Sequence, residues 1–269
     1  IKVEKPNGDD SRRYGPFIDK KSCYFLSLNR GKKSILLDLK KEEDKKIFEK
    51  ILSNSDVLIE NYRPDTLKSL GYSWSRLKKN YPKLIYAKIS GFGENGPMSK
   101  LPAYDVIVQA MSGIMSITGS SKDSFSRVGT SIGDIAAGLF CTIGIISALY
   151  DRQSSKFGTK IDISMLDCQI AILENAIARY SVSNENPIPL GTDHPSISPF
   201  GAFNTLDEKI VLAAGNNKIF KKLCFLLSRK DLYSNKLFTD NEKRNNNINV
   251  LRYEIEKTLK LKKSKYWIK

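Results

Sequence analysis

Residues 101–140, LPAYDVIVQAMSGIMSITGSSKDSFSRVGTSIGDIAAGLF, form the stretch around which the chain is organised. Tyr104 and Asp105 begin a short apolar run, and a loop rich in Gly and Ser follows it, ending near Arg127. Asp134 then stands at the start of a long apolar segment, 132–149, in which Ala, Gly, Ile, Leu and Phe dominate. This composition predicts a helix that is buried on most sides.

The carboxylate of Asp134 allows two interpretations. Asp is favoured at helix starts because its oxygens accept hydrogen bonds from free backbone N–H groups and its charge complements the helix dipole. The same surroundings would keep the carboxylate ionised and hold it in a fixed orientation, as a carboxylate nucleophile requires. The sequence pattern by itself leaves both the capping role and the nucleophilic role open.

Strand-like and helical segments alternate on both sides of this stretch. We expect strands at 34–39, 56–60, 84–89 and 160–164, and helices at 41–53, at 74–81 and from 165 to about 178. Such alternation predicts an α/β fold with helices packed on a parallel sheet. Ligands bind at the carboxyl ends of the strands in such sheets, and ENYRP at 60–64 and SGFGENGP at 90–97 both follow strands.

A second, smaller unit is expected towards the C-terminus. The stretch SVSNENPIPLGTDHPSISP at 181–199 holds four prolines, which is typical of a linker. Beyond it we expect strands at 200–203 and 210–213 and a helix that starts at 215–217, whereas NEKRNNNINV at 241–250 is typical of a solvated loop. The predicted division is a large domain over 1–182, a linker over 183–199 and a partial small α+β domain over 200–269.

The charge balance is strongly basic, because 44 Lys and Arg residues oppose 29 Asp and Glu residues. The lysines are nevertheless spread along the chain, and in KKEEDKKIFEKIL at 40–52 they alternate with acids in a way typical of a solvated helix face. No nucleic-acid-binding motif accompanies them. We therefore predict no nucleic-acid partner, and a basic surface would equally attract a small anion rich in phosphate.

Other residue types exclude several kinds of site. The four cysteines show no metal-ligand spacing and are expected to be reduced; they are Cys23, Cys141, Cys168 and Cys224. A single histidine, His194, excludes a zinc site with two or more imidazoles, and no metal site is predicted. No uninterrupted apolar run reaches the ~18 residues that cross a membrane, and no signal peptide is visible, so no membrane association is expected.

Eight motifs along the chain resemble, in order, those of the family III CoA-transferases (the CaiB/BaiF family), which include formyl-CoA transferase, carnitine CoA-transferase and the methylacyl-CoA racemases. They are IKVEKP at 1–6, NRGKKSILLDL at 29–39, DVLIENYRP at 56–64, LIYAKISGFGENGP at 84–97, AYDVIVQAMSG at 103–113, GDIAAGL at 133–139, FGTKIDISMLD at 157–167 and DHPSISPFGAF at 193–203. The resemblance implies a Rossmann-like, CoA-binding large domain, and homodimers whose two chains interlock like rings. It also implies further units before residue 1 and after residue 269, so the chain is expected to be truncated at both ends.

The resemblance assigns the chemistry to Asp134. In the family, the matching Asp attacks the thioester of an acyl-CoA, and CoA passes to a carboxylic acid through an aspartyl-CoA thioester. The co-substrate is then an acyl-CoA, the partners are small carboxylic acids, and the location is cytoplasmic, or the mitochondrial matrix in a eukaryote. The alternatives are a CoA-ester racemase or carnitine-type dehydratase relative, and a fragment that binds CoA without catalysis.

Five positions match the CoA site of formyl-CoA transferase: Lys5, Leu37, Lys40, Asn61 and Tyr62. Each also has a structural interpretation, because lysines are usually exposed and leucines usually buried, and an Asn before a proline can cap a turn. Two positions depart from the family pattern. Pro102 replaces a basic residue of the CoA site, and SKFGT at 155–159 replaces the usual T-G-K/R-G-Q loop.

Tyr104, which we also assign to the CoA site, separates the activities within the family. The racemases carry a His there, as one of two bases that exchange a proton, and a Tyr with a pKa near ~10 is a poor base at neutral pH.

The blocks RVGTSIGD at 127–134, GTDHPSISPFGAF at 191–203 and VLAAGNN at 211–217 are especially similar to succinyl-CoA:glutarate CoA-transferase. That similarity implies dicarboxylic substrates, whose distal carboxylate Arg127 or His194 would meet. The alternatives are a loop salt bridge for Arg127 and a turn-stabilising hydrogen bond for His194.

Overall fold

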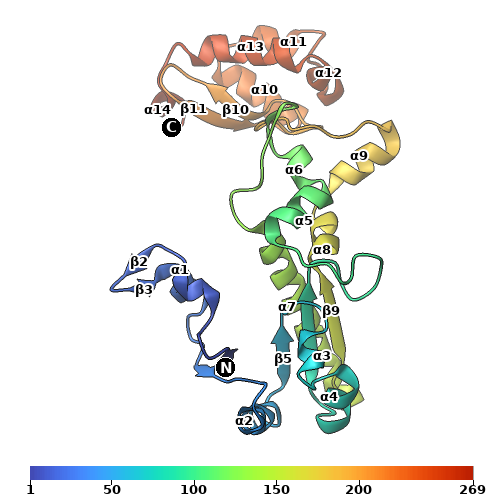
Figure 1. The fold of residues 1–269 in the computed structure, drawn as a ribbon. Helices are drawn as coiled ribbons and strands as arrows, with labels where there is room; N and C mark the ends of the chain where they lie inside the picture. The colour runs from blue at the N-terminus through green and yellow to red at the C-terminus, as the bar shows by residue number, and fades with distance from the viewer. Residues whose placement is uncertain (269) are drawn as a thin grey trace. The chain divides into compact units, whose positions relative to one another are not determined.

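The structure is a computed structural model that describes residues 1–268. The chain divides into two compact units, the first formed by 1–112 and 130–172, and the second by 113–129 and the described chain from 173 onward. Each unit is described by itself below. Figure 1 shows the course of the chain from the N-terminal strands to the C-terminal helices.

The first unit is built on a three-stranded parallel sheet with the order β5-β6-β9. Its strands are β5 (Val57–Glu60), β6 (Ile85–Ser90) and β9 (Lys160–Ser164), with Val57 opposite Ile85 and Tyr86 opposite Lys160. The central strand β6 is almost wholly buried, as expected when helices cover both faces of a parallel sheet. The predicted α/β class with a parallel sheet is confirmed.

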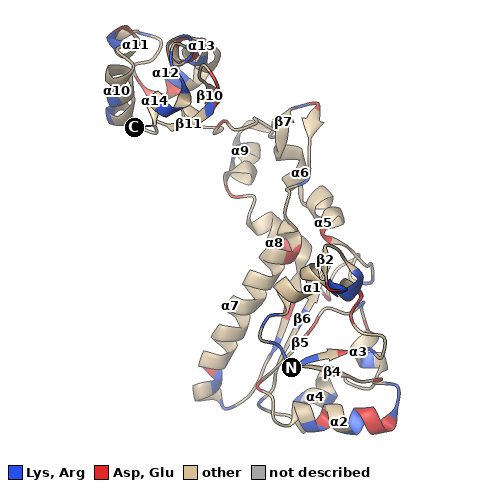
Figure 2. Ribbon diagram, turned by 90° about the vertical axis from the view of Figure 1, so that its left-hand side faces the viewer, with Lys and Arg blue, Asp and Glu red and all other residues tan. Residues whose placement is uncertain are grey.

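Alternate residues of β6 face two different cores. Tyr86 packs with Leu67 and Leu77 in a cluster formed with α2 (Glu42–Leu52), α3 (Thr66–Ser69) and α4 (Trp74–Asn80). Ile89 packs in the other cluster, against α5 (Asp105–Ser112), α7 (Ile132–Ser155) and α8 (Met165–Ala171). Successive strand residues point to opposite faces, so one strand serves both cores, with α7 on one side of the sheet and α3 on the other (Figure 2).

The N-terminal segment is held by one buried carboxylate. Strand β1 (Lys2–Glu4) pairs in parallel with β4 (Ser34–Leu36), and between them lie η1 (Asp10–Arg13), β2 (Phe17–Ile18), β3 (Lys21–Ser22) and α1 (Cys23–Leu28). The Glu4 carboxylate accepts hydrogen bonds from Arg12 Nε and Nη2, both at 2.7 Å, and from Ser34 Oγ at 2.6 Å. These donors, Arg12 first, lower the pKa of Glu4 to about 2, so the carboxylate stays ionised although it is buried.

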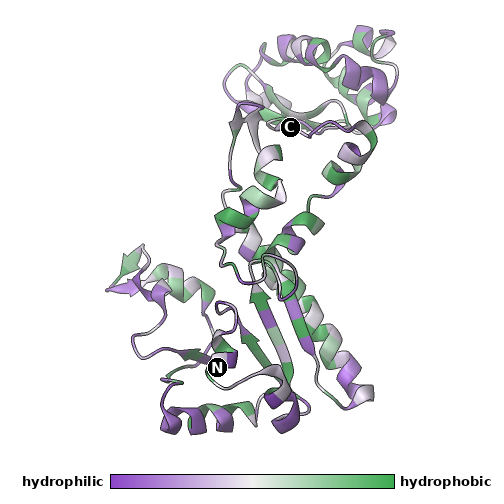
Figure 3. Ribbon diagram, turned by 45° about the vertical axis from the view of Figure 1, so that its right-hand side comes forward, coloured by the Kyte–Doolittle hydropathy of each residue, from purple (hydrophilic) through white to green (hydrophobic). Residues whose placement is uncertain are grey.

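The long helix α7 is not buried on most sides, which corrects the expectation from its composition. Its buried residues are Gly133, Ala136, Ala137, Cys141 and Ala148, which are small and lie on one side of the helix. The larger residues on the other side are exposed in this chain: Ile135, Leu139, Ile143, Ile146 and Tyr150. Figure 3 shows the hydrophobic colour along α7. A helix that is apolar all round needs a neighbour on every side, and this chain supplies neighbours for one side only.

By length and hydropathy, α7 also meets the criteria for a membrane span, over Ile132–Ser155. The same criteria are met by core helices of water-soluble proteins, and the small-residue side of α7 packs against α5 and α8. The expected absence of membrane association therefore stays a prediction.

The second unit contains an antiparallel hairpin covered by helices. Strands β10 (Phe200–Asn204) and β11 (Lys209–Ala213) are the two strands expected here, and they pair with Phe203 opposite Ile210. The helices that follow are α10 (Asn217–Leu226), α11 (Lys230–Ser234), α12 (Asn241–Asn246), α13 (Ile248–Leu259) and α14 (Ser264–Trp267). Phe203, Phe220 and Leu251 lie at the centre of their shared core. The unit also holds α6 (Ile114–Ile117), β7 (Gly119–Ser121), β8 (Ser124–Phe125) and α9 (Asn175–Ser183).

Two segments differ from the sequence-based expectation. The helix expected from 165 to about 178 is interrupted between α8 and α9, where Glu174 adopts a positive φ of 52°. The expected solvated loop at 241–250 is helical and contributes to the core. Its Arg244 is fully buried and donates from Nε to Ser198 O at 2.7 Å and from Nη1 to Asn217 Oδ1 at 2.9 Å.

Arg244→Ala should destabilise the second unit by about 3 kcal/mol or more, because it leaves the buried carbonyls of Ser198 and Phe238 without donors. Urea unfolding followed by circular dichroism measures this change. Lys243→Ala, at the exposed neighbouring position, should change the free energy of unfolding by less than about 1 kcal/mol. Equal effects of the two substitutions would contradict the structural role of Arg244.

Candidate active site

A pocket of about 630 Å³ lies at the carboxyl ends of β5 and β6. The loop after β5, the end of β6, the segment before α5 and the first turns of α5 and α7 form its wall, together with Met165 of α8. Its volume falls in the range typical of small-molecule sites. Its lining residues are Asn61, Tyr62, Arg63, Pro64, Ser90, Gly91, Leu101, Pro102, Ala103, Tyr104, Asp105, Val106, Ile107, Ser131, Asp134 and Met165.

Asp134 reaches this pocket from the first turn of α7, as the third residue of the helix. Its carboxylate has no hydrogen bond or ion pair with any of the residues that the structure describes. The backbone N–H of Gly133 donates instead to Oδ1 of Asp105, on α5, at 2.8 Å. The capping interpretation of Asp134 is therefore wrong, because the carboxylate of Asp105, on another helix, accepts the hydrogen bond from the start of α7.

The surroundings of Asp134 disfavour its charged form. Loss of solvent contact raises the pKa of Asp134, and the negative charge of Asp105 raises it further. The sequence led us to expect surroundings that favour ionisation, and the shift has the opposite direction. Asp134 is partly accessible to solvent, and a carboxylate free of hydrogen-bond donors keeps its lone pairs available for attack on an electrophile.

Asn61 and Tyr62 form the wall next to the strand ends. Asn61 Nδ2 donates to Ile89 O at 2.8 Å, which ties the end of β5 to the end of β6. The Tyr62 N–H donates to Glu60 Oε2 at 2.6 Å, and the other Glu60 oxygen accepts from Tyr86 Oη at 2.8 Å. Burial, followed by the Glu60 charge, raises the pKa of the Tyr62 hydroxyl, so this group stays a neutral donor.

The segment that carries Tyr104 crosses the end of β6 closely. A Cβ at Gly91 would lie 2.6 Å from the Cβ of Ala103, so only glycine allows this approach. Tyr104 itself is 81% exposed and lines the pocket beside Pro102. Tyr104 is therefore free to contact a ligand, whereas the backbone around it is fixed by the contact with Gly91.

The three other residues matched to the CoA site do not line the pocket. Lys5 is exposed, and its ammonium pairs with Asp10 at 2.8 Å. The side chain of Leu37 is buried in the core, and Lys40 is an exposed lysine after β4. The structural interpretations of Lys5 and Leu37 thus describe their present contacts, and a role in binding CoA remains a prediction for all three.

Arg127 and His194 belong to the second unit. Arg127 donates from Nη2 to Gly129 O at 2.7 Å and from Nε to Val128 O at 3.1 Å, so its partners are carbonyls of its own loop. His194 Nδ1 accepts from the N–H of Ser196 at 3.0 Å, which is the turn-stabilising bond considered above. Their roles towards a substrate stay predictions.

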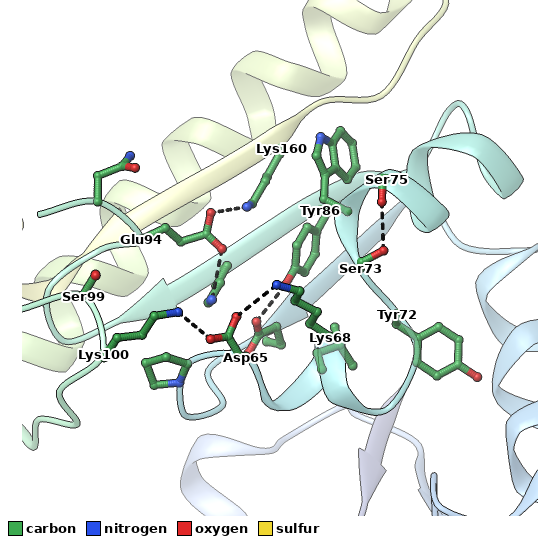
Figure 4. Close-up of a pocket in the computed structure, with 16 residues that line it drawn as sticks. Asp65, Lys68, Tyr72, Ser73, Ser75, Tyr86, Glu94, Ser99, Lys100 and Lys160 are labelled. Carbon is green, nitrogen blue, oxygen red and sulfur yellow. Dashed lines mark hydrogen bonds and ion pairs between the residues drawn. The ribbon is translucent and has the colours of Figure 1, made fainter.

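A second, more polar pocket of about 400 Å³ lies on the α3 and α4 side of the sheet (Figure 4). Glu94 pairs there with Lys160 and, at 3.0 Å, with Lys88, while Asp65 pairs with Lys100 at 2.5 Å. Burial opposes ionisation of Glu94, but the hydrogen bonds from the two lysines lower its pKa. The Glu94 and Asp65 carboxylates of this pocket are thus paired with lysines, and the Glu94 pairs tie the glycine-rich loop to β6 and β9.

Sequence reasoning assigned no individual role to several residues of the main pocket, among them Arg63, Asp105 and Ser90. Asp105 was quoted within a motif but received no role, although an Asp at the start of an apolar helix was a usable signal. Ser90 is buried at the end of β6, and its hydroxyl has no hydrogen-bond partner among the described residues. No sequence signal separates Ser90 from an ordinary strand serine. Among residues 1–268, no group of three or more His, Cys, Asp or Glu side chains is placed to hold a metal ion.

The parallel sheet with helices on both faces and a pocket at its strand ends defines an α/β domain. The sequence profile of CoA-transferase family III matches residues 1–269, and the chain belongs to this family. It is 42% identical over 270 residues to the acetyl-CoA:oxalate CoA-transferase of Acetobacter aceti, covering 100% of this chain and 69% of that protein. It is 37% identical over 268 residues to the human succinyl-CoA:glutarate CoA-transferase, covering 97% of this chain and 61% of that protein.

Solved structures agree with this family assignment. A CaiB/BaiF family protein from Brucella suis superposes with a TM-score of 0.84 at 34% identity, over 99% of this chain and 72% of that one. A hypothetical protein from Mycobacterium tuberculosis superposes with a TM-score of 0.87 at 28% identity, over 99% and 71%. The chain thus spans roughly two thirds of the length of these curated relatives and somewhat more of the solved ones.

Asp134→Asn should make the chain slightly more stable at neutral pH. A carboxyl whose pKa is raised on folding favours the folded state below its unfolded value near ~3.9, and this contribution is lost as the pH rises through the folded value. Asn removes that loss, so the melting temperature should rise at pH 7, and the difference should shrink as the pH falls towards ~4. Thermal unfolding of both proteins across this range measures it, and a destabilising effect at pH 7 would contradict the unfavourable setting of the charge.

Proposed function

We propose that this protein is a CoA-transferase that moves CoA from an acyl-CoA, such as succinyl-CoA, to a small carboxylic acid through a thioester on Asp134. The observation that carries the proposal is the Asp134 carboxylate, which is unpaired in a pocket at the carboxyl ends of parallel strands. The named relatives act between acyl-CoA and dicarboxylates, namely oxalate, succinate and glutarate. That agreement supports a dicarboxylic acid as donor or acceptor here.

The reaction splits into two acyl exchanges. An oxygen of Asp134 attacks the thioester carbonyl, the C–S bond breaks, and a mixed anhydride and CoA thiolate result. The thiolate then attacks the Asp134 carbonyl carbon, which releases the donor acid and leaves an aspartyl-CoA thioester. An acceptor carboxylate reverses these two steps, so Asp134 returns as a carboxylate and no net proton is consumed.

The pocket residues have separate roles in this scheme. Asn61 and Tyr62 line the pocket at the strand ends, where the pantetheine arm and thioester would enter, and Tyr104 lines the same pocket. Arg63, which also lines the pocket, supplies a positive charge for a carboxylate group. The N–H groups of the glycine-rich loop after β6 are candidates to stabilise the oxyanions.

The remaining expectations complete the proposal. Lys5, Leu37 and Lys40 would contact the nucleotide part of CoA, and Arg127 or His194 the distal carboxylate of the acid. The whole protein would be a cytoplasmic or mitochondrial-matrix homodimer of interlocked chains. Basic residues outnumber acidic ones along this chain, which suits the anionic phosphates of CoA.

A racemase is the second candidate, and the pocket disfavours it. Racemisation needs two bases on opposite faces of the reacting carbon. No histidine is among the described residues that line the pocket, and the position of the family's histidine is occupied by Tyr104. Tyr104 is largely exposed to solvent and has no cationic partner among the described residues that would make it a base.

The test is mass spectrometry of the natural full-length protein after incubation with succinyl-CoA. We expect a CoA adduct on the peptide that contains Asp134, which hydroxylamine removes and which is absent from Asp134→Asn. Asp151→Asn, at the exposed far end of α7, is the matched control and should form the adduct normally. Absence of any adduct across several acyl-CoAs would contradict the nucleophile and favour the racemase or a binding-only protein.

A further inference from the structure

We propose that Asp105 is the positioning residue for Asp134: it holds the first turn of α7 against α5 and places a second negative charge beside the nucleophile. This inference rests on the proposed function of Asp134, and it assigns a role to a residue that the reaction scheme does not use. Three observations carry it, namely the hydrogen bonds of Asp105, the packing at Gly133 and the charges that line the pocket.

The first observation is that both oxygens of Asp105 are committed. Oδ1 accepts from the Gly133 N–H at 2.8 Å, and Oδ2 accepts from Gln109 Nε2 at 2.8 Å, one turn further along α5. The residue that precedes α7, Ser131, makes no side-chain capping bond. The start of α7 is thus capped from a different helix, and the cap residue is itself held in place by Gln109.

The second observation is the absence of space between the two helices. A Cβ on Gly133 would lie 2.8 Å from Val108 Cγ2 and 2.9 Å from Asp105 Oδ1. Real side chains do not tolerate such distances, so only glycine lets α5 approach the backbone of α7 this closely. Asp134 is the next residue, and its backbone position is therefore set by the contact between Asp105 and Gly133.

The third observation is that the two carboxylates of this pocket differ in their hydrogen bonding. Asp105 receives two hydrogen bonds, whereas Asp134 receives none from the described residues. The other ionisable groups that line the pocket are Tyr62, Arg63 and Tyr104, and Cys168 of α8 lies in the same core cluster as Ala136 and Ala137 of α7. Of all these groups, Asp105 is the one whose charge raises the pKa of Asp134.

These observations give Asp105 and Asp134 different roles. Asp105, whose two oxygens accept hydrogen bonds, places a fixed negative charge near Asp134, and this charge makes the Asp134 carboxylate more basic than it would be without that neighbour. A more basic carboxylate is a stronger nucleophile towards the thioester carbon. Asp105 thus fixes where the attacking oxygen lies and increases its reactivity, without touching the acyl group.

Two variants separate position from charge. Asp105→Asn keeps an oxygen that accepts from the Gly133 N–H but removes the charge, whereas Asp105→Ala removes both. With ¹³C-labelled Asp, NMR titration reports the pKa of Asp134, and hydrogen exchange of the Gly133 amide reports the cap. We expect Asp105→Asn to lower the pKa of Asp134 with the Gly133 amide still protected, and Asp105→Ala to lower both the pKa and the protection.

Kinetics supply the second readout. The acid limb of the kcat profile should move to lower pH in Asp105→Asn, and kcat should fall by roughly 100-fold in Asp105→Ala with little change in KM for the acyl-CoA. Asp151→Asn, which removes one charge from the other end of the same helix, should leave the titration and kinetics unchanged.

An unchanged pKa of Asp134 in Asp105→Asn would overturn the inference, even if Asp105→Ala fails to fold. The NMR titration needs no turnover, so it tests the effect of Asp105 on the pKa of Asp134 whether or not the protein catalyses the proposed reaction. A normal pKa response without any CoA adduct would reject the proposed function alone, and an adduct without a pKa response would reject the role of Asp105 alone.

Discussion

The hydrogen bond from the Gly133 N–H to Asp105 Oδ1 is the contact on which the candidate site depends. It joins two helices that are separated in the sequence by the whole 113–129 segment, which belongs to the other compact unit. Without it, the backbone N–H of Gly133 in the first turn of α7 would lose its hydrogen-bond acceptor. With it, the next side chain, Asp134, enters the pocket from a defined position and without a partner of its own.

The pleat of β6 explains why the chain has two dissimilar pockets. Tyr86 and Lys88 point to the α3 and α4 side, where lysines neutralise Glu94 and the resulting network holds the glycine-rich loop. Ile89 points to the α7 side, and the strand ends beyond it at the pocket that contains Asp134. The paired charges therefore support the loop, and the unpaired charge remains available for chemistry.

Sequence patterns predicted the elements whose periodicity is strong, such as the parallel strands and α2, and the position of Asp134 at a helix start. They failed where contacts between residues distant in the sequence decide which side chains are buried or paired. The polar run 241–250 looked solvated, yet Arg244 is buried, and its guanidinium donates to the carbonyl of Ser198, which lies 46 residues away in the sequence. Asp105 was overlooked for the same reason, since its partner lies 28 residues away. Composition also overestimated the burial of α7, because hydrophobicity shows what a helix can bury and not which neighbours this chain provides.

The most direct test of the central claim follows oxygen atoms. In the proposed route, one oxygen of the acceptor carboxylate bridges the second anhydride and remains on Asp134 when the new thioester forms. Turnover with an ¹⁸O-labelled dicarboxylate should therefore place ¹⁸O in the side chain of Asp134, seen as a heavier peptide in mass spectrometry, and no label should enter Asp105. Rapid CoA transfer without ¹⁸O in Asp134 would contradict the account, because the carboxylate could not then have carried the acyl group.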